Sequence, residues 1–115
     1  MVTKTIWISY DLGVGGDYES LYAWFDNNGA IECGNSLAYM KVDIANDDDE
    51  LLLETLKKSI SENVKINAKS RIYIIRRLVK GDDSKVVGKF IFGKRKGNPW
   101  DGFGNIENLT VNDGE

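Results

Sequence analysis

The chain contains no histidine, one cysteine and one proline among its 115 residues. The lack of histidine excludes an imidazole general base, a Ser–His or Cys–His nucleophile pair and a His-ligated zinc site. Because Cys33 is the single cysteine, an intrachain disulfide and a structural zinc site are excluded, and a reducing compartment, the cytoplasm, is expected. Cys33 lies in a segment typical of a strand, without a basic neighbour, so we expect a structural thiol and not a nucleophile. Any chemistry therefore depends on carboxylates, lysine, tyrosine or a hard cation bound by oxygen.

Long apolar runs are also missing. No segment approaches the roughly 20 apolar residues that span a bilayer, and the first residues alternate like a strand, without the apolar region of a secretory signal. We therefore expect no membrane partner and no leader. The length and the hydrophobic content of 42% indicate one globular domain. We place this domain at residues 1–96 and a C-terminal tail at residues 97–115.

The charges are unevenly distributed around a net charge of −3. Residues 71–96 hold nine of the 15 basic residues and two acidic ones, whereas residues 97–115 hold four acidic residues and no basic one. A basic stretch with interleaved aromatic residues indicates a surface that binds phosphates and stacks bases. The alternative is a solvated strand face whose lysines oppose aggregation at a sheet edge, with residues 94–96 as a partner of the acidic tail.

Residues 3–22 organise the predicted fold. Ile6, Ile8 and Tyr10 alternate with more polar positions, which predicts a strand. Glycines at positions 13, 15 and 16 then allow a turn with positive φ. Asp17 predicts the N-cap of a helix over residues 17–28. Asp11, at the end of the strand, has two interpretations: it caps the glycine turn by accepting backbone hydrogen bonds, or it binds a metal.

The glycine turn itself has the composition of a phosphate-binding loop but lacks its key residues. It has no GK[ST] sequence, and Tyr18 occupies the third-glycine position of a GxGxxG fingerprint. Asp17 at the start of the helix would also repel a phosphate. We therefore expect only a flexible turn.

The rest of the chain predicts four further strands and one helix. A hairpin is expected over residues 30–44, a helix from the acidic run at 46–50 to about residue 62, a strand over 71–80 and a returning strand over 85–94. This order predicts an α+β, ferredoxin-like βαββαβ antiparallel sheet with the helices on one face, plus an extra C-terminal strand. The uncovered face should be buried by a second copy, at Trp7 and Tyr39. In the tail, Ile106, Leu109 and Val111 either add an edge strand or remain partly disordered.

The acidic run at residues 46–50 first suggests a metal site. Acidic residues are also favoured at the N-cap and first turn of a helix, where they complement the helix dipole. Because the apolar residues of the next helix begin immediately at Leu51, we favour the capping interpretation.

Three segments carry a family resemblance: ISYDL at 8–12, DYESLY at 17–22 and GAIECGNSLAYMKVD at 29–43. Together they resemble the SinR-like group, which is related to small CRISPR-associated endonucleases that work as ferredoxin-fold homodimers. The resemblance covers residues 3–77 and implies that Asp11 faces its copy across a dimer axis and holds Mg²⁺ or Mn²⁺. Several relatives keep the fold without demonstrated nuclease activity. The chain has LGVGGD where the nucleases have a polar, basic run after this aspartate, which favours a non-catalytic member.

Three functions follow as hypotheses. The first, which we favour at this point, is a cytoplasmic homodimeric interaction or regulatory protein without catalysis or a required cofactor. The second is a Mg²⁺- or Mn²⁺-dependent endonuclease that uses Asp11 as both metal ligand and catalytic residue. The third is a nucleic-acid binder that does not cleave. Its predicted binding residues are Arg71, Arg76, Arg77, Lys89, Lys94, Arg95 and Lys96.

Overall fold

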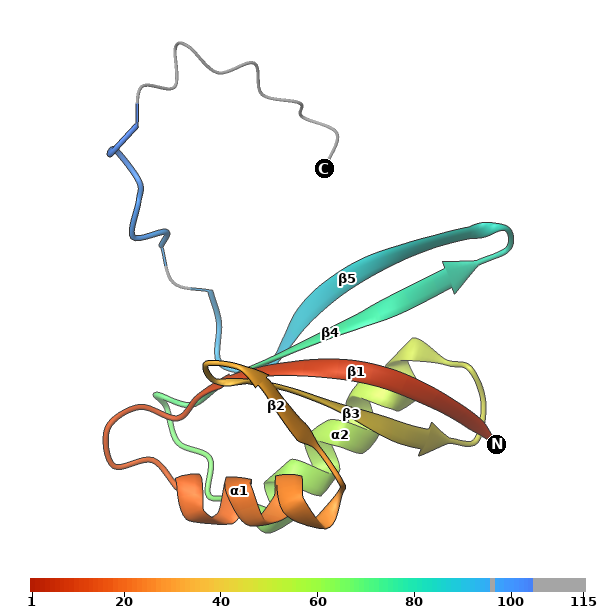
Figure 1. Cartoon of the computed structure of the whole chain (residues 1–115), viewed down its shortest axis with the longest axis horizontal. Coiled ribbons are helices and arrows are strands. Elements are labelled where there is room, and N and C mark those ends of the chain that lie inside the picture. Colours follow the sequence, from red (N-terminus) through yellow and green to blue (C-terminus); the bar gives the residue numbers. More distant parts are fainter. Residues whose placement is uncertain (96, 105–115) are drawn as a thin grey trace.

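The computed structural model of the chain describes residues 1–95 and 97–104. Its elements run in the order β1 (Val2–Asp11), α1 (Tyr18–Asn27), β2 (Ile31–Gly34), β3 (Leu37–Ile44), α2 (Asp49–Asn63), β4 (Arg71–Lys80) and β5 (Asp83–Phe92). The strands form one antiparallel sheet in the order β2-β3-β1-β4-β5. Both helices lie on one side of this sheet, and the chain leaves the end of β5 on the other side (Figure 1).

The expected α+β class is confirmed, with an antiparallel sheet and two helices. The ferredoxin-like βαββαβ order is not matched, because the strand order is β2-β3-β1-β4-β5 and two strands follow α2. The physical reason is the long hairpin after α2, in which β5 pairs along the whole length of β4 and extends the sheet beyond it. The strand predicted from Ile106, Leu109 and Val111 lies outside the described residues.

The core lies between the helices and one face of the sheet. On β1 the side chains alternate as predicted: Ile6 and Ile8 are fully buried, whereas Trp7 between them is 37% exposed. The buried residues of the helices are Leu21, Trp24, Phe25, Leu52, Leu53, Leu56 and Ile60. The i, i+3, i+4 and i+7 spacing of Tyr18, Leu21, Tyr22 and Phe25 predicts one buried stripe on α1, but Tyr22 is exposed and Trp24 is buried instead. The indole Nε1 of Trp24 donates a 2.9 Å hydrogen bond to Ser59 Oγ of α2.

Acidic side chains cap both helices, as the sequence predicts. Asp17 Oδ1 accepts a hydrogen bond from the Ser20 amide at the start of α1. Asp48 Oδ1 accepts from the amides of Glu50 and Leu51 at the start of α2. The neighbouring carboxylates of the acidic run bind cations of the sheet, with Asp47 on Lys4 and Asp49 on Arg76. The run therefore caps a helix and forms ion pairs.

The outer half of the β4–β5 hairpin extends beyond the rest of the sheet (Figure 1). Pairing between β1 and β4 ends at Ile6 and Arg76, whereas β4 and β5 stay paired as far as Lys80 and Asp83. Val79 and Val86, which lie on this outer half, are 48% and 70% exposed. A two-stranded ribbon of this kind has little stability of its own in water.

Candidate nucleic-acid interface

Asp11 and Arg71 meet at the end of the sheet where β1 stops and β4 starts. The antiparallel register places them directly opposite each other, and the Arg71 guanidinium forms an ion pair with the Asp11 carboxylate. Asp11 Oδ1 also accepts a 2.9 Å hydrogen bond from the Gly13 amide. Gly13 has a φ of +76°, a conformation that side-chain-bearing residues rarely adopt. The capping interpretation of Asp11 is therefore confirmed, and Arg71 is its second partner.

Two cavities of about 390 and 750 Å³ open around this ion pair and share Asp11, Arg71 and Arg95 as lining residues. We call them together the basic groove. Lys69 and Lys94 line its larger part. Among the described residues that line the groove, four are cationic and one, Asp11, is acidic. The groove therefore favours an anion.

The chemistry of these cations suits phosphate. A guanidinium offers a planar fork of N–H donors that fits two oxygens at once, and a lysine ammonium acts as a mobile point charge. A guanidinium has five N–H donors, so the pairing of Arg71 with Asp11 leaves donors for another acceptor. Because the groove is open to solvent, each contact should be weak and sensitive to salt.

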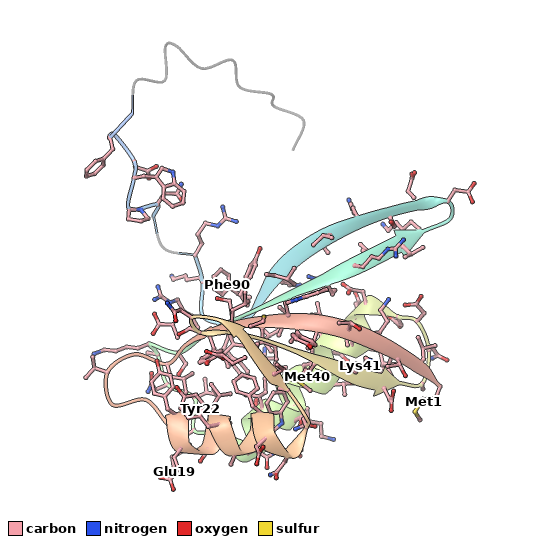
Figure 2. The ribbon with its side chains drawn as sticks, in the orientation of Figure 1. Met1, Glu19, Tyr22, Met40, Lys41 and Phe90 are labelled. Carbon is pink, nitrogen blue, oxygen red and sulfur yellow. The ribbon has the colours of Figure 1, made fainter. Side chains whose placement is uncertain are left out.

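An aromatic pair forms one wall of the smaller cavity. Tyr73 of β4 and Phe90 of β5 have ring centroids 4.7 Å apart at an interplanar angle of 60°. Figure 2 shows Phe90 on the side of the sheet away from Tyr22 and α1. Tyr73 lies over Gly88, where a methyl group would come within 2.2 Å of the tyrosine oxygen. The missing side chain at Gly88 thus lets the Tyr73 ring lie across β5.

The structure brings together only part of the predicted binding set. Arg71, Lys94 and Arg95 line the basic groove. Arg76 is 5% exposed and bound to Asp49. Arg76 lies two positions after the buried Ile74 on β4, so both side chains point to the helix side of the sheet. Arg76 therefore does not belong to the groove.

The remaining predicted residues lie elsewhere. Lys89 pairs with Ile74 across the β4–β5 ladder and so points to the helix side, where its charge helps to lower the pKa of Asp49. Arg77 is exposed on the hairpin, and Lys96 lies outside the described residues. Sequence reasoning missed Lys69, whose signal is its place two positions before β4, and Asn98, which lines the smaller cavity.

The predicted metal site at Asp11 depends on the Asp11 of a second copy and stays a prediction. Within residues 1–95 and 97–104, no three or more histidine, cysteine, aspartate or glutamate side chains gather in a group able to hold a metal ion. A metal at Asp11 would have to compete with Arg71 for the same carboxylate.

A third cavity, of about 310 Å³, lies on the helix side of the sheet between α1 and β2. Its wall includes Tyr10, whose hydroxyl donates a 2.8 Å hydrogen bond to Glu32. Burial raises the pKa of Tyr10 above its ordinary range, and the bond to Glu32 raises this pKa further. Tyr10 is therefore a neutral structural group and not a base.

Comparisons with protein-family models, curated proteins and solved structures gave no match to this chain. The resemblance to the SinR-like group therefore remains a prediction from the residues. In the part of the chain that the structure describes, no helix has both the length and the apolar composition needed to cross a membrane.

Proposed function

We propose that this domain binds nucleic acid without cleaving it, with the phosphates held in the basic groove. The observation that carries the proposal is the gathering of Lys69, Arg71, Lys94 and Arg95 around one carboxylate, beside the ring pair of Tyr73 and Phe90. Single-strand recognition in general combines two components, which are cations that hold the phosphates and aromatic rings that contact the bases. A cytoplasmic location, expected from the single cysteine, is compatible with such a ligand.

The position of the ion pair supports this proposal over the nuclease hypothesis. The Asp11 carboxylate binds Arg71 and the Gly13 amide, so it orients a cation of the groove. In this role Asp11 is a positioning residue. The nuclease hypothesis, which requires the Asp11 of a second copy, is an outcome of the experiment below.

A homodimeric interaction protein is the second candidate function, supported by the exposed Val79 and Val86 on the outer half of the β4–β5 hairpin. Burial of these side chains by a second copy would remove apolar surface from water. This contact is compatible with nucleic-acid binding, because the outer half of the hairpin and Arg71 lie at opposite ends of β4.

The test uses a triple variant that neutralises the groove but keeps the Asp11–Arg71 pair: Lys69→Gln, Lys94→Gln and Arg95→Gln. The matched control, Lys58→Gln, Lys80→Gln and Lys85→Gln, removes the same charge from exposed positions elsewhere. Fluorescence anisotropy with labelled RNA and DNA strands is measured between 50 and 200 mM salt. We expect the groove variant to lose about tenfold or more in affinity and to show a smaller salt slope, since each phosphate contact contributes about −0.7 to that slope.

Equal weakening by the groove variant and the control would mean that the cations attract nucleic acid without forming a site, and would reject the proposal. The same strands are incubated with Mn²⁺ and analysed for cleavage. Cleavage that requires Mn²⁺ and disappears in Asp11→Ala would replace the proposal by the nuclease function.

A further inference from the structure

The side of the sheet opposite the helices, which we call the open face, carries a continuous apolar row across all five strands. The register places Ile31 opposite Tyr39, Tyr39 opposite Trp7, Trp7 opposite Ile75, and Ile75 opposite Gly88. These residues belong to the open face because their neighbours along the strands point into the core under α1 and α2.

A second row lies two residues along the strands, towards the basic groove. It contains Leu37, Ser9, Tyr73 and Phe90 in successive register. The open face thus presents four aromatic rings, of which Trp7 is 37% exposed although it is the largest side chain of the sheet. Aromatic rings on an uncovered sheet are available for stacking, whereas buried rings would serve only the core.

The rings form a path that leads away from the groove. Tyr73 lies opposite Ser9, so Trp7 is its diagonal neighbour, and Tyr39 lies directly opposite Trp7. Diagonal and direct cross-strand neighbours are about 7–8 and about 5 Å apart. Steps of this size let neighbouring bases of an extended strand reach successive rings.

The charges at the borders of the face favour a polyanion. Arg71 and Arg95 lie at the groove end together with Asp11. Beyond the apolar row lie Lys41 and Arg77, followed by Asp43 opposite Thr3. The cations of these borders therefore outnumber the acidic side chains. The two rows themselves contain no charged side chain. In a twofold dimer through this face, the same cation-bordered surface would meet itself, which is less favourable than contact with a negatively charged strand.

We infer that the ligand is a single strand that runs from the basic groove over the open face, with its bases stacked on Tyr73, Trp7 and Tyr39. The inference rests on the proposed function and specifies its substrate class. The ligand is a single strand because a duplex keeps the faces of its bases stacked inside, whereas an unpaired strand exposes them to aromatic side chains.

The experiment measures affinity for a labelled ten-nucleotide oligo(dT) strand and its RNA counterpart, with a duplex of the same length as comparison. Trp7→Ala and Tyr39→Ala should each weaken single-strand binding about fivefold or more, in line with alanine substitution at stacking positions. Trp7→Phe should restore most of the affinity. Tyr22→Ala, which removes an exposed aromatic ring on α1 at the other side of the sheet, should leave affinity unchanged and is the matched control.

Two further readouts separate stacking from a loss of structure. The Trp7 and Tyr39 variants should keep the salt slope of the wild type, since they remove no phosphate contact, whereas the groove variant lowers that slope. In a Trp100→Phe background, which removes the other exposed tryptophan, oligo(dT) should quench tryptophan fluorescence when Trp7 is present and much less in Trp7→Phe, because Trp24 is buried in the core.

The outcomes of these experiments distinguish a failure of the proposed function from a failure of the stacking path. If the groove variant loses affinity but Trp7→Ala and Tyr39→Ala bind like the wild type, the proposed function stands and the stacking path is wrong. If the wild type binds neither strand, both are rejected. If light scattering finds a dimer that Trp7→Ala converts to a monomer, with strand affinity unchanged, the open face is an interface between copies and the inference is overturned.

Discussion

Arg76 of β4 and Asp49 of α2 form a bidentate ion pair beneath the sheet. The guanidinium donates from Nε to Asp49 Oδ1 at 2.8 Å and from Nη2 to Oδ2 at 2.6 Å. Arg76 is 5% exposed, so its charge lies in the interior and depends on this carboxylate for neutralisation. The pair joins the first residue of α2 to the centre of the sheet.

Removal of Asp49 should therefore destabilise the domain. Asp49→Ala leaves the Arg76 charge buried without its carboxylate, and we expect the free energy of unfolding to fall by about 2–3 kcal/mol. Urea unfolding followed by circular dichroism measures this change. Asp47→Ala is the control, because the side chain of Asp47 is 57% exposed in its pair with Lys4; it should cost less than about 1 kcal/mol. Equal losses in the two variants would contradict the buried role of Arg76.

The ion pair of Arg76 and Asp49 should make the free energy of unfolding depend on pH in the acidic range. Hydrogen bonding from Arg76 lowers the pKa of Asp49 below its ordinary value, against the opposing effect of burial. A carboxyl group whose pKa is lower in the folded state stabilises the protein above its unfolded pKa, and this stability is lost as the pH falls through its folded pKa.

Unfolding of the wild type and Asp49→Asn at a series of pH values between neutral and strongly acidic tests this expectation. The stability difference between the two proteins should be largest near neutral pH and should shrink on acidification, because other carboxyl groups titrate equally in both. A difference that stays constant over the whole range would show that Asp49 does not carry the pH dependence.

Ser59 should contribute to the packing of α1 on α2 through Trp24. Ser59→Ala removes the acceptor of the indole Nε1 hydrogen bond and leaves a donor beside a nearly buried ring, so we expect a loss of about 1–2 kcal/mol. Ser61→Ala is the control, since Ser61 is exposed and bonds only within α2, to the Lys57 carbonyl. Thermal unfolding followed by near-ultraviolet circular dichroism, to which the buried Trp24 contributes, measures both. Unchanged unfolding of Ser59→Ala would show that the bond adds nothing.

Gly88 should control the position of Tyr73. Its replacement by alanine places a methyl group within 2.2 Å of the tyrosine oxygen, so the ring must move away from β5 and from Phe90. We expect Gly88→Ala to destabilise the domain by about 1–3 kcal/mol and to weaken single-strand binding. In a double-mutant cycle with Tyr73→Ala, both effects of Gly88→Ala should largely disappear. Additive effects would mean that Gly88 acts through the backbone and not through Tyr73.

Most elements could be predicted from the sequence to within about two residues, although β5 is Asp83–Phe92 where a strand over 85–94 was expected. The strand over residues 71–80 coincides with β4, and the helix ends lie close to the predicted ones. These features depend on side-chain periodicity, glycine and capping residues, all of which act over a few positions. The burial of Trp24, in place of Tyr22, on the inner side of α1 could not be predicted, because the Trp24 indole bonds to Ser59 of the other helix.

The sequence predicted the basic composition of the candidate site but not which residues line it. The basic stretch after residue 70 was visible as a run of charge, yet Arg71 and Arg76 point to opposite faces of one strand. Which face receives α2, and therefore Asp49, is decided by how the sheet packs. Lys69 and Asn98 lie outside regular strands, so no periodicity marked them as members of the groove.

The sequence by itself determined the strands, the helices, their acidic caps and the absence of histidine- or thiol-based chemistry, since each follows from local pattern or composition. The tertiary structure alone decided that Asp11 meets Arg71, 60 positions along the chain, and that Tyr73 and Phe90 share the uncovered face with Trp7 and Tyr39. The physical reason is that strand register and strand order bring distant residues together. Both are set by burial of the whole core and by no single segment.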